Sequence, residues 1–390
     1  MKNILLVAAE NSAETYAVQV VNEFASQGGG FHFWGIGGDR LAACGFENVV
    51  HNRSLSVVGI VEVVAHLWRI RGIMRRVFRQ ALERHADAAL LIDYPDFNLR
   101  LARRLRRAGI PVYYYISPTV WAWRYGRVAQ IRRWVSRLFV IFPFEAPIYE
   151  KEKVTFTYTG HPLLSLVRAG ESRDDFRRRH NVGAGDLLLA LLPGSRESEV
   201  AMLLPEIMGA VRRLQNEFPM KVFLQRAQNI APGSLAAAGA DVRVLGQEQG
   251  YDLLNAADAV ITTCGTSNLE AALLAVPFVA VYRVNRLTYL LGRRFLKIGL
   301  YSIVNILAGH QVVAELIQKE CRAERIYEES KKLLSDKPLR EGMRREFARI
   351  RESLQQEERP AAIICRKIKE EFAARRTADG GWEDKGKRQK

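Results

Sequence analysis

Cysteine is scarce in this chain and forms no recognisable framework. The four cysteines are Cys44, Cys264, Cys321 and Cys365. Their wide spacing fits neither a set of disulfides nor the ligand spacing of a metal site. We therefore expect a protein of a reducing compartment.

Long apolar segments are missing as well. No apolar run reaches the length that a bilayer-spanning helix needs. The first residues, MKNILLVAAE, carry one lysine and a short apolar run before Glu10, which predicts a core strand rather than a signal peptide. Neither half of the chain has a Gly-x-Gly-x-x-Gly spacing after its first predicted strand, so the dinucleotide fingerprint is missing from the sequence.

Acidic residues are too few to balance the basic ones. The 390 residues include 58 lysines and arginines against 42 aspartates and glutamates, for a formal net charge of +16. Such a chain favours an anionic partner, either nucleic acid or an anionic lipid surface. Composition does not choose between the two, although no nucleic-acid motif supports the first.

Short apolar segments alternate with amphipathic ones, which predicts an α/β fold. With 48% hydrophobic residues, the chain can fill two domain cores. The predicted strands are Lys2–Ala8, Phe31–Ile36, Ala88–Asp93, Val112–Ile116, Leu138–Ile141, Phe156–Thr159, Leu187–Leu192, Val222–Gln225, Val242–Val244, Ala259–Thr262 and Phe278–Tyr282. We expect two doubly wound, Rossmann-like domains that face one another across a cleft.

The first domain is expected over residues 1–167 and the second over 168–345, with the charged stretch Arg168–Asn181 as linker or hinge. A helix over 346–372 is expected to cross back to the first domain. The remaining residues, 373–390, are expected to be disordered because they are polar and charged.

The turn after Leu187–Leu192 is the centre of the predicted site. The strand breaks at Pro193-Gly194, and Ser195 is a good cap for a following helix. Gly194, the Ser195 hydroxyl, free helix amides and Arg196 together suit a phosphate or diphosphate. The alternative is a turn that binds nothing, with Arg196 as a solvated surface arginine.

Carboxylates end two predicted strands of the first half, at the edge where open α/β folds bind ligands. Glu10 follows the first strand, and Asp93 ends the third, with Asp96 close behind it in the segment DYPDF. Such carboxylates are well placed for base catalysis, but each can instead merely cap the helix that follows. Trp121 and Trp123 follow the next strand in SPTVWAWR. They could stack on a sugar or plug the domain.

The stretch Ser54–Arg79 has too many apolar residues for one buried stripe, and five arginines follow or interleave with them. A helix with this composition fits a membrane interface, because apolar side chains enter the acyl boundary while cations meet lipid phosphates. The alternative is a core helix with a solvated basic end.

These segments together resemble one family, the lipid A disaccharide synthases, which are inverting glycosyltransferases of the GT-B type. The resemblance rests on VVGIVEV, IDYPDFN, SPTVWAWR, FPFE, the pair Gly160-His161, LLPGSR, the pair Gly265-Thr266 with Glu270, and NILAG, which occur in the family's order over roughly residues 1–345.

The resemblance implies that UDP-2,3-diacylglucosamine donates its sugar to 2,3-diacylglucosamine 1-phosphate (lipid X), giving lipid A disaccharide 1-phosphate and UDP in lipid A and lipopolysaccharide biosynthesis. It implies neither a cofactor nor a metal. By position, Asp93 resembles the general base, Arg196 the diphosphate ligand, and Glu10 and Asn305 residues important for activity. The substrate-binding residues that it implies are Gly194, Ser195, Gly265, Thr266, Glu270, Trp121, Trp123 and Arg124, with Glu270 on the ribose.

Both implied substrates carry acyl chains, which gives the helix from Ser54 a reason to meet lipid. We therefore expect a cytoplasmic protein attached peripherally to the inner face of the cytoplasmic membrane, with Val64, Leu67 and Trp68 as membrane contacts. The oligomeric state stays open, a homodimer being one alternative.

The chain also departs from the family's pattern. Its first loop reads AENSAE where the family usually has GEASGD, so Ala9 and Ala13 replace glycines that would permit positive φ. Ser267 and Asn268 replace small apolar residues. Two other interpretations compete: another GT-B enzyme of UDP-sugars, such as an N-acetylglucosaminyltransferase or an epimerase, and a non-enzymatic basic protein that binds RNA or anionic membrane.

Overall fold

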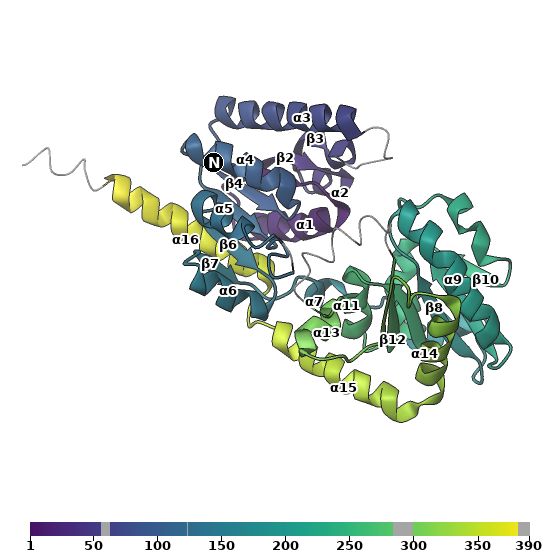
Figure 1. The fold of residues 1–390 in the computed structure, drawn as a ribbon. Coiled ribbons are helices and arrows are strands. Elements are labelled where there is room, and N and C mark those ends of the chain that lie inside the picture. Colours follow the sequence, from purple (N-terminus) through teal and green to yellow (C-terminus); the bar gives the residue numbers. More distant parts are fainter. Residues whose placement is uncertain (56–62, 123, 284–298, 381–390) are drawn as a thin grey trace, which may run out of the picture. The chain divides into compact units, whose positions relative to one another are not determined.

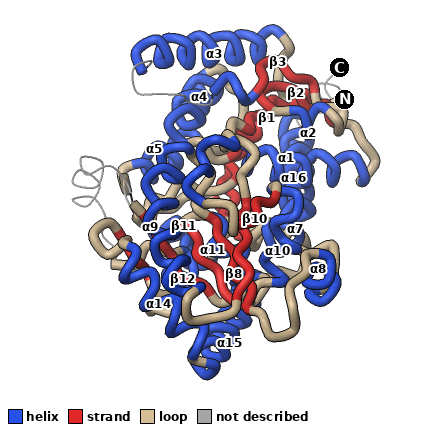
Figure 2. The backbone as a smooth tube through the Cα atoms, turned by 90° about the vertical axis from the view of Figure 1, so that its right-hand side faces the viewer, coloured by secondary structure: helices blue, strands red, loops and turns tan. Residues whose placement is uncertain are grey.

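The computed structural model describes residues 1–55, 63–122, 124–283 and 299–380. The chain divides into unit 1, which comprises Met1–Pro162 and Gln356–Lys390, and unit 2, which comprises Leu163–Gln355. Figure 1 labels the elements of both units, and Figure 2 distinguishes their strands from their helices. Among the described residues, no helix is long and apolar enough to cross a membrane.

Unit 1 is built on a seven-stranded sheet in the order β3-β2-β1-β4-β5-β6-β7, with every pair parallel. The strands are β1 Lys2–Ala8, β2 Phe31–Gly37, β3 Glu47–His51, β4 Ala88–Ile92, β5 Val112–Tyr115, β6 Arg137–Val140 and β7 Phe156–Tyr158. The central strands β4 and β5 are buried along their whole length, because helices cover both faces of such a sheet. The carboxyl ends of all the strands therefore share one edge.

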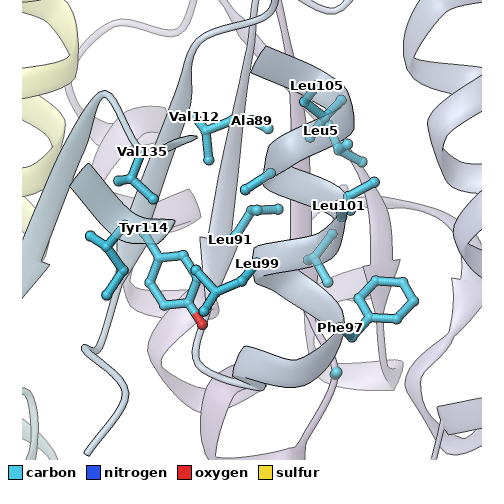
Figure 3. Packing of buried hydrophobic residues seen from close by; sticks show 14 of the residues in the cluster. Leu5, Ala89, Leu91, Phe97, Leu99, Leu101, Leu105, Val112, Tyr114 and Val135 are labelled. Carbon is cyan, nitrogen blue, oxygen red and sulfur yellow. The ribbon is translucent and has the colours of Figure 1, made fainter. Parts of the chain in front are cut away.

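The helices of unit 1 are α1 Asn11–Ser26, α2 Asp39–Ala42, α3 Val63–Glu83, α4 Pro95–Arg107, α5 Arg127–Trp134, α6 Ala146–Lys151 and α16 Pro360–Gly380. Helix α4 shows how they attach: Phe97, Leu101 and Leu105 recur at helical spacing and belong to the same buried cluster as Leu5 of β1 and Leu91 of β4 (Figure 3).

Helix α16 belongs to unit 1 although it lies at the end of the sequence, and it packs against α1 (Figure 1). The Glu371 carboxylate accepts from the Arg137 guanidinium of β6 at 2.5 Å and from the Tyr113 hydroxyl of β5 at 3.0 Å. Arg359 pairs with Glu23 of α1 at 3.0 Å. These contacts attach the end of the chain to the first sheet.

Unit 2 is built on a six-stranded parallel sheet in the order β10-β9-β8-β11-β12-β13. The strands are β8 Leu187–Leu192, β9 Met220–Gln225, β10 Val242–Leu245, β11 Ala259–Thr263, β12 Phe278–Tyr282 and β13 Glu315–Ile317. The helices are α7 Leu163–Leu166, α8 Arg173–Arg179, α9 Glu197–Gln215, α10 Gly250–Ala256, α11 Thr266–Leu273, α13 Ile303–Ala308, α14 Ala323–Ser335 and α15 Lys337–Leu354.

The predicted strands are confirmed within two residues at each end. Strands of a parallel sheet are buried on both faces, so they are continuous apolar runs that can be recognised in the sequence. Two strands were missed. β3 begins with the polar pair Glu47-Asn48, and β13 has only three residues, so neither carries an apolar run that periodicity could detect.

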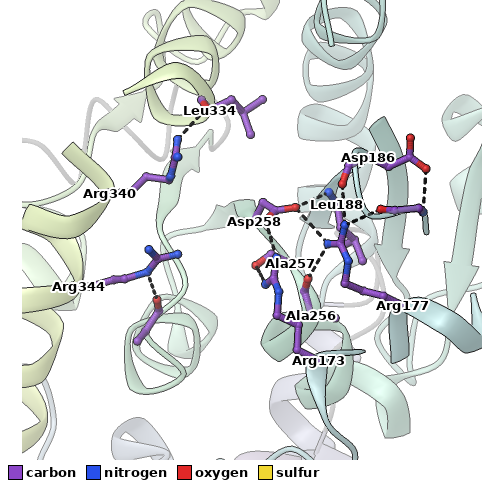
Figure 4. A network of polar contacts seen from close by, with 12 residues as sticks. Arg173, Arg177, Asp186, Leu188, Ala256, Ala257, Asp258, Leu334, Arg340 and Arg344 are labelled. Carbon is purple, nitrogen blue, oxygen red and sulfur yellow. Dashed lines mark hydrogen bonds and ion pairs between the residues drawn. The ribbon is translucent and has the colours of Figure 1, made fainter. Parts of the chain in front are cut away.

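The stretch Arg168–Asn181 is not a free linker, which corrects the prediction. It contains α8, whose Arg173 and Arg177 contact the Asp258 carboxylate at 2.5 and 3.3 Å (Figure 4). Asp258 also accepts from the Leu188 backbone N–H at 2.7 Å. The arginines that suggested a solvated hinge therefore attach this segment to the amino ends of β8 and β11.

The C-terminal region also differs from the prediction. The contact boundary lies after Pro162 rather than after residue 167. Two helices, α15 and α16, replace the single helix expected over 346–372, and the second begins at Pro360, where the missing N–H of proline starts a helix well. Because α16 continues to Gly380, residues 373–380 are helical rather than disordered.

Candidate active site

Asp93 directly follows β4 and has an unusual backbone. Its φ is 49° and that of Tyr94 is 46°, so two consecutive non-glycine residues are left-handed. Each such residue costs of the order of 1 kcal/mol or more and persists only where its surroundings hold it. The carbonyl of Asp93 accepts from the Tyr114 hydroxyl at 2.6 Å and from the Asn98 side-chain amide at 2.7 Å. The strained turn thus holds the Asp93 carboxylate at the carboxyl edge of the sheet.

The electrostatic surroundings of Asp93 suit a base. Burial, and secondly the negative charge of Glu10, raise the pKa of Asp93 from 3.8 to about 6. The strand register explains the nearness of Glu10, because Ala8 of β1 pairs with Ile92 of β4. A carboxylate with a pKa near 6 is mostly ionised at neutral pH and is a better proton acceptor than an ordinary aspartate.

Glu10 occupies the N-cap position of α1, but its side chain makes no capping hydrogen bond. The interpretation of Glu10 as a mere helix cap therefore does not describe what its carboxylate does. The loop that follows needs no glycine at Ala9 or Ala13, since neither is among the positive-φ residues. Instead Glu14 is buried and accepts from the Leu41 backbone N–H at 3.1 Å, which fixes this loop to α2.

Asp96, the alternative base, is held between two arginines. Its carboxylate contacts Arg124 at 2.9 Å and Arg127 at 2.6 Å, and the Arg127 side chain is only 7% exposed. Arg124, predicted to bind substrate, is thus at least partly engaged by Asp96. Trp123 lies outside the described residues.

Trp121 packs edge-on against Phe144 at 5.2 Å between ring centroids, and Phe144 stacks on Phe142, which contacts the ring of His161. The WAWR, FPFE and Gly-His segments thus converge in one aromatic cluster. In the same segments, burial raises the pKa of Glu145 to about 8 and lowers that of His161 to about 3, so both are mainly uncharged at neutral pH. These contacts of Trp121 agree with the alternative that it fills space within the domain.

The turn after β8 has the predicted glycine but a different cap. Gly194 has φ 125°, and a Cβ there would lie 2.8 Å from an oxygen of Glu199, so only glycine fits without displacement. The N-cap of α9 is Arg196, which corrects the assignment of Ser195. Glu199 accepts from the Arg196 guanidinium at 2.7 Å and from the Ser195 backbone N–H at 3.3 Å. An anion that binds this turn must therefore compete with Glu199.

The turn after β11 lies beside the turn after β8, because Thr262 of β11 pairs with Leu192 of β8. Gly265 is the N-cap of α11, and Thr266, the first residue of this helix, is exposed. The Ser267 hydroxyl and the Asn268 amide both donate to the carbonyl of Thr263. These two departures from the family's pattern therefore support the turn through hydrogen bonds.

Glu270 lies one helical turn beyond Thr266, the first residue of α11. Its carboxylate accepts from the Tyr251 hydroxyl of α10 at 3.0 Å, and burial raises its pKa. A carboxylate fixed in this way can accept hydrogen bonds from the hydroxyls of a ribose.

Asn305 is fully buried, and its side chain is used within its own loop rather than exposed to a ligand. Other residues of the site lay beyond sequence reasoning: Asn98, Tyr114, Tyr251 and Glu315. Asn98 alone lies in a motif that the sequence had singled out, IDYPDFN. The other residues are common types at positions without a pattern, and only their contacts identify them.

Comparison with known proteins agrees along nearly the whole chain. The profile of the lipid-A-disaccharide synthetase family matches residues 4–368. The chain is 41% identical over 360 residues to lipid-A-disaccharide synthase of Geobacter sulfurreducens, covering 90% of this chain and 92% of that protein. It is 40% identical over 352 residues to the synthase of Myxococcus xanthus, covering 89% and 92%.

Solved structures of low sequence identity share the fold. MurG of Acinetobacter baumannii superimposes with a TM-score of 0.57 at 16% identity, over 95% of this chain and 100% of that chain. The UDP-GlcNAc 2-epimerase of Neisseria meningitidis bound to UDP-GlcNAc superimposes with a TM-score of 0.63 at 10% identity, over 96% and 100%. These likenesses establish the GT-B fold predicted from the sequence.

Proposed function

This chain belongs to the lipid-A-disaccharide synthetase family, and from that premise we propose how its residues carry out the reaction. The chain is a glycosyltransferase of lipid A biosynthesis: it joins the sugar of UDP-2,3-diacylglucosamine to 2,3-diacylglucosamine 1-phosphate and releases UDP. The two competing interpretations, another UDP-sugar enzyme and a non-enzymatic basic protein, are set aside by this membership.

Asp93 is the general base of the transfer. It takes the proton from the primary hydroxyl of the acceptor while the oxygen attacks the anomeric carbon of the donor from the side opposite UDP, which inverts the configuration there. The left-handed turn that holds this carboxylate at the carboxyl end of β4 is the observation that carries this assignment. Burial and Glu10 raise its pKa to about 6, so it is ionised at neutral pH yet basic enough to accept the proton. Glu10 contributes by keeping that pKa raised.

The departing UDP is stabilised at the turn after β8. Negative charge develops on the diphosphate as the glycosidic bond breaks, and the Arg196 guanidinium with the backbone amides at Ser195 can stabilise it. Glu199 holds both groups before the donor arrives, so it orients Arg196 and must release the Ser195 N–H to the diphosphate. Gly265 and Thr266 at the start of α11 approach the nucleotide, and Glu270 binds its ribose.

Peripheral attachment to an anionic membrane surface is supported by α3. Met74, Val77 and Ala81 are buried, so the second half of the helix belongs to the protein core. The proposed membrane contact is therefore limited to the first half of the helix. Trp68, in contrast, is 61% exposed. Its ring lies 5.4 Å from the Arg71 guanidinium. The side chains of Val64 and Leu67 lie outside the described residues.

A cavity of about 610 Å³ opens between α3 and β3, and three of its seven lining residues are arginines. Arg76, Arg79 and Arg84 contribute to it, together with Glu47, which already pairs with Arg84 at 2.8 Å. The lining therefore carries a net positive charge that suits the phosphate of a lipid headgroup.

The reaction is tested by incubating the purified protein with UDP-2,3-diacylglucosamine and lipid X and measuring UDP and disaccharide. UDP-GlcNAc, which has no acyl chains, serves as the control donor. Equal turnover of both donors would contradict the proposed substrate class.

The membrane contact is tested by replacing Val64, Leu67 and Trp68 with serine. Burial contributes at most about 1.5–3 kcal/mol for each inserted side chain, and each arginine near the surface about 1 kcal/mol. The triple variant should leave anionic vesicles and show a raised KM for the lipid acceptor at an unchanged melting temperature. Val244→Ser with Leu339→Ser, two exposed apolar positions of unit 2, is the matched control. Undiminished sedimentation of the triple variant with vesicles would place the lipid contact elsewhere.

A further inference from the structure

Asn305 uses every hydrogen-bonding group of its side chain inside unit 2. Its oxygen accepts from the backbone N–H groups of Val312 at 2.8 Å and Val313 at 2.9 Å. Its amide donates to the carbonyl of Val313 at 3.0 Å and to the carboxylate of Glu315 at 2.7 Å. A carboxamide has two donor hydrogens and two acceptor lone pairs, so no capacity is left for a substrate.

Glu315 is the centre of this arrangement. It is the first residue of β13, where it pairs in register with Ala280 of β12. Besides the Asn305 amide, its carboxylate accepts from the backbone N–H of Tyr301 at 3.0 Å and from that of Ser302 at 2.8 Å. Three donors from α13 and the two residues before it therefore converge on one side chain.

The segment held by Glu315 supports the predicted donor site. Helix α13 packs against α11, the helix whose first turn contains Thr266. Glu315 is also close to the residue before Gly265: burial, and secondly the charge of Glu315, raise the pKa of the Cys264 thiol. The strand register gives the geometry, because Glu315 pairs with Ala280 of β12 and Ala280 pairs with Thr262 of β11. Glu315 therefore lies level with the carboxyl end of β11, while α13 packs against the helix that follows this strand.

We propose that Glu315 is a positioning residue for the transfer reaction, which with Asn305 holds α13 against α11 and thereby sets the turn at Gly265-Thr266 for the donor nucleotide. This proposal rests on the role assigned above to that turn. Asn305 then supports activity through Glu315 and the 301–302 backbone rather than by touching substrate.

Glu315→Gln is the first test. Glutamine has one acceptor oxygen instead of two and brings an NH₂ group toward backbone N–H donors, so at least one of the three donors loses its partner. Because hydrogen bonds to a charged group are stronger than those between neutral groups, we expect the Kd for UDP and the KM for the donor to rise by about tenfold or more. The KM for lipid X should stay within twofold of wild type, and kcat should fall much less than the donor KM rises.

A second test exchanges the carboxylate and the amide between Glu315 and Asn305, which should partly restore UDP binding. Asn305→Asp alone places a second carboxylate against Glu315 and should weaken UDP binding at least as much as Glu315→Gln. When Asn305→Asp is combined with Glu315→Gln, the glutamine amide can donate to the new carboxylate. The double variant should therefore bind UDP more tightly than Asn305→Asp alone, which a general loss of stability cannot produce.

Glu206→Gln is the matched control, because Glu206 is a part-buried carboxylate of unit 2 that accepts a backbone N–H, that of Ala323, at 2.8 Å. It should leave UDP affinity unchanged. If Glu315→Gln folds poorly, hydrogen exchange on Glu315→Asp replaces it, with faster exchange expected at residues 299–309 and 265–270.

A Kd for UDP within twofold of wild type in Glu315→Gln, or normal exchange at both segments in Glu315→Asp, would overturn the proposal. Wild-type protein that fails to bind UDP would instead count against the donor site itself, so the two failures are distinguishable.

Discussion

The turn after β4 in unit 1 and the turn after β11 in unit 2 occupy equivalent places in their sheets. Each strand lies beside the first strand of its sheet, β1 or β8, and each is followed by a helix. In both, a buried asparagine near the start of that helix donates its amide to the carbonyl of the turn: Asn98 to Asp93, and Asn268 to Thr263.

The two turns differ in the chemical groups that they present at the edge of the sheet. In unit 1 the backbone is left-handed at Asp93 and Tyr94 and presents a partly buried acid with a raised pKa. In unit 2 Gly265 is extended, with φ −153°, and leads directly into the helix amides at Thr266. The same kind of turn therefore provides a base in unit 1, where the backbone is strained. In unit 2, where the backbone is extended, it provides an anion-binding site.

The largest effect is expected from Asp93→Asn, which keeps the shape of the first turn and removes its base. General-base catalysis typically contributes about 10²- to 10⁴-fold, so kcat should fall by that factor. UDP binding, measured by calorimetry, should be unchanged, because the carboxylate acts on the acceptor. Asp96→Asn is the comparison variant, and an equal or greater loss there would transfer the role to Asp96.

Arg196→Ala tests the anion-binding side of the comparison. The guanidinium should contact the diphosphate before and during bond cleavage, so UDP affinity and turnover should fall together, by about 10- to 100-fold for a charged hydrogen bond. Arg212→Ala, in the last turn of the same helix, should change neither. Unchanged UDP affinity in Arg196→Ala would mean that the anion site has been misplaced.

Replacing the asparagine that supports each turn should produce a different kinetic defect in each unit. Asn98→Ala and Asn268→Ala each remove one of the donors to a carbonyl that keeps another, which costs about 0.5–1.5 kcal/mol in the free energy of unfolding. Asn98→Ala should lower kcat at normal UDP affinity, whereas Asn268→Ala should weaken UDP binding. Chemical denaturation with parallel kinetics measures both, and the same kinetic defect in both variants would break the comparison.

The smallest expected effect is a shift of the pH profile. Asp93 must be ionised to accept a proton, so kcat/KM should fall as the pH drops through about 6. Glu10→Gln removes the negative charge that helps to raise this pKa, so the acidic limb should move to lower pH. The shift should be smaller than that caused by burial, which is the larger contribution. A limb that stays in place would show that the charge of Glu10 does not act on Asp93.

The AENSAE loop shows how a local rule can mislead. Loss of two glycines predicted a restricted backbone, yet Ala9 and Ala13 are buried and are not positive-φ residues. The positive φ that does matter occurs at Asp93 and Tyr94, where no glycine marks it. Sequence reasoning finds left-handed backbone through glycine, and it fails where tertiary hydrogen bonds impose that conformation on other residues.

The sequence by itself determined the α/β class, nearly every strand and the residues at the strand ends, because apolar runs of strand length and the turns after them are local properties. It also indicated the chemistry of the site, since acids, arginine and glycines at the carboxyl ends of strands are informative types at informative places. Tertiary structure alone decided how these groups are held. The left-handed turn at Asp93 is held by Tyr114 and Asn98, and three donors from residues 301–305 converge on Glu315. These arrangements depend on residues that are not neighbours in the sequence or on backbone strain, and they are stable only once the sheets have formed.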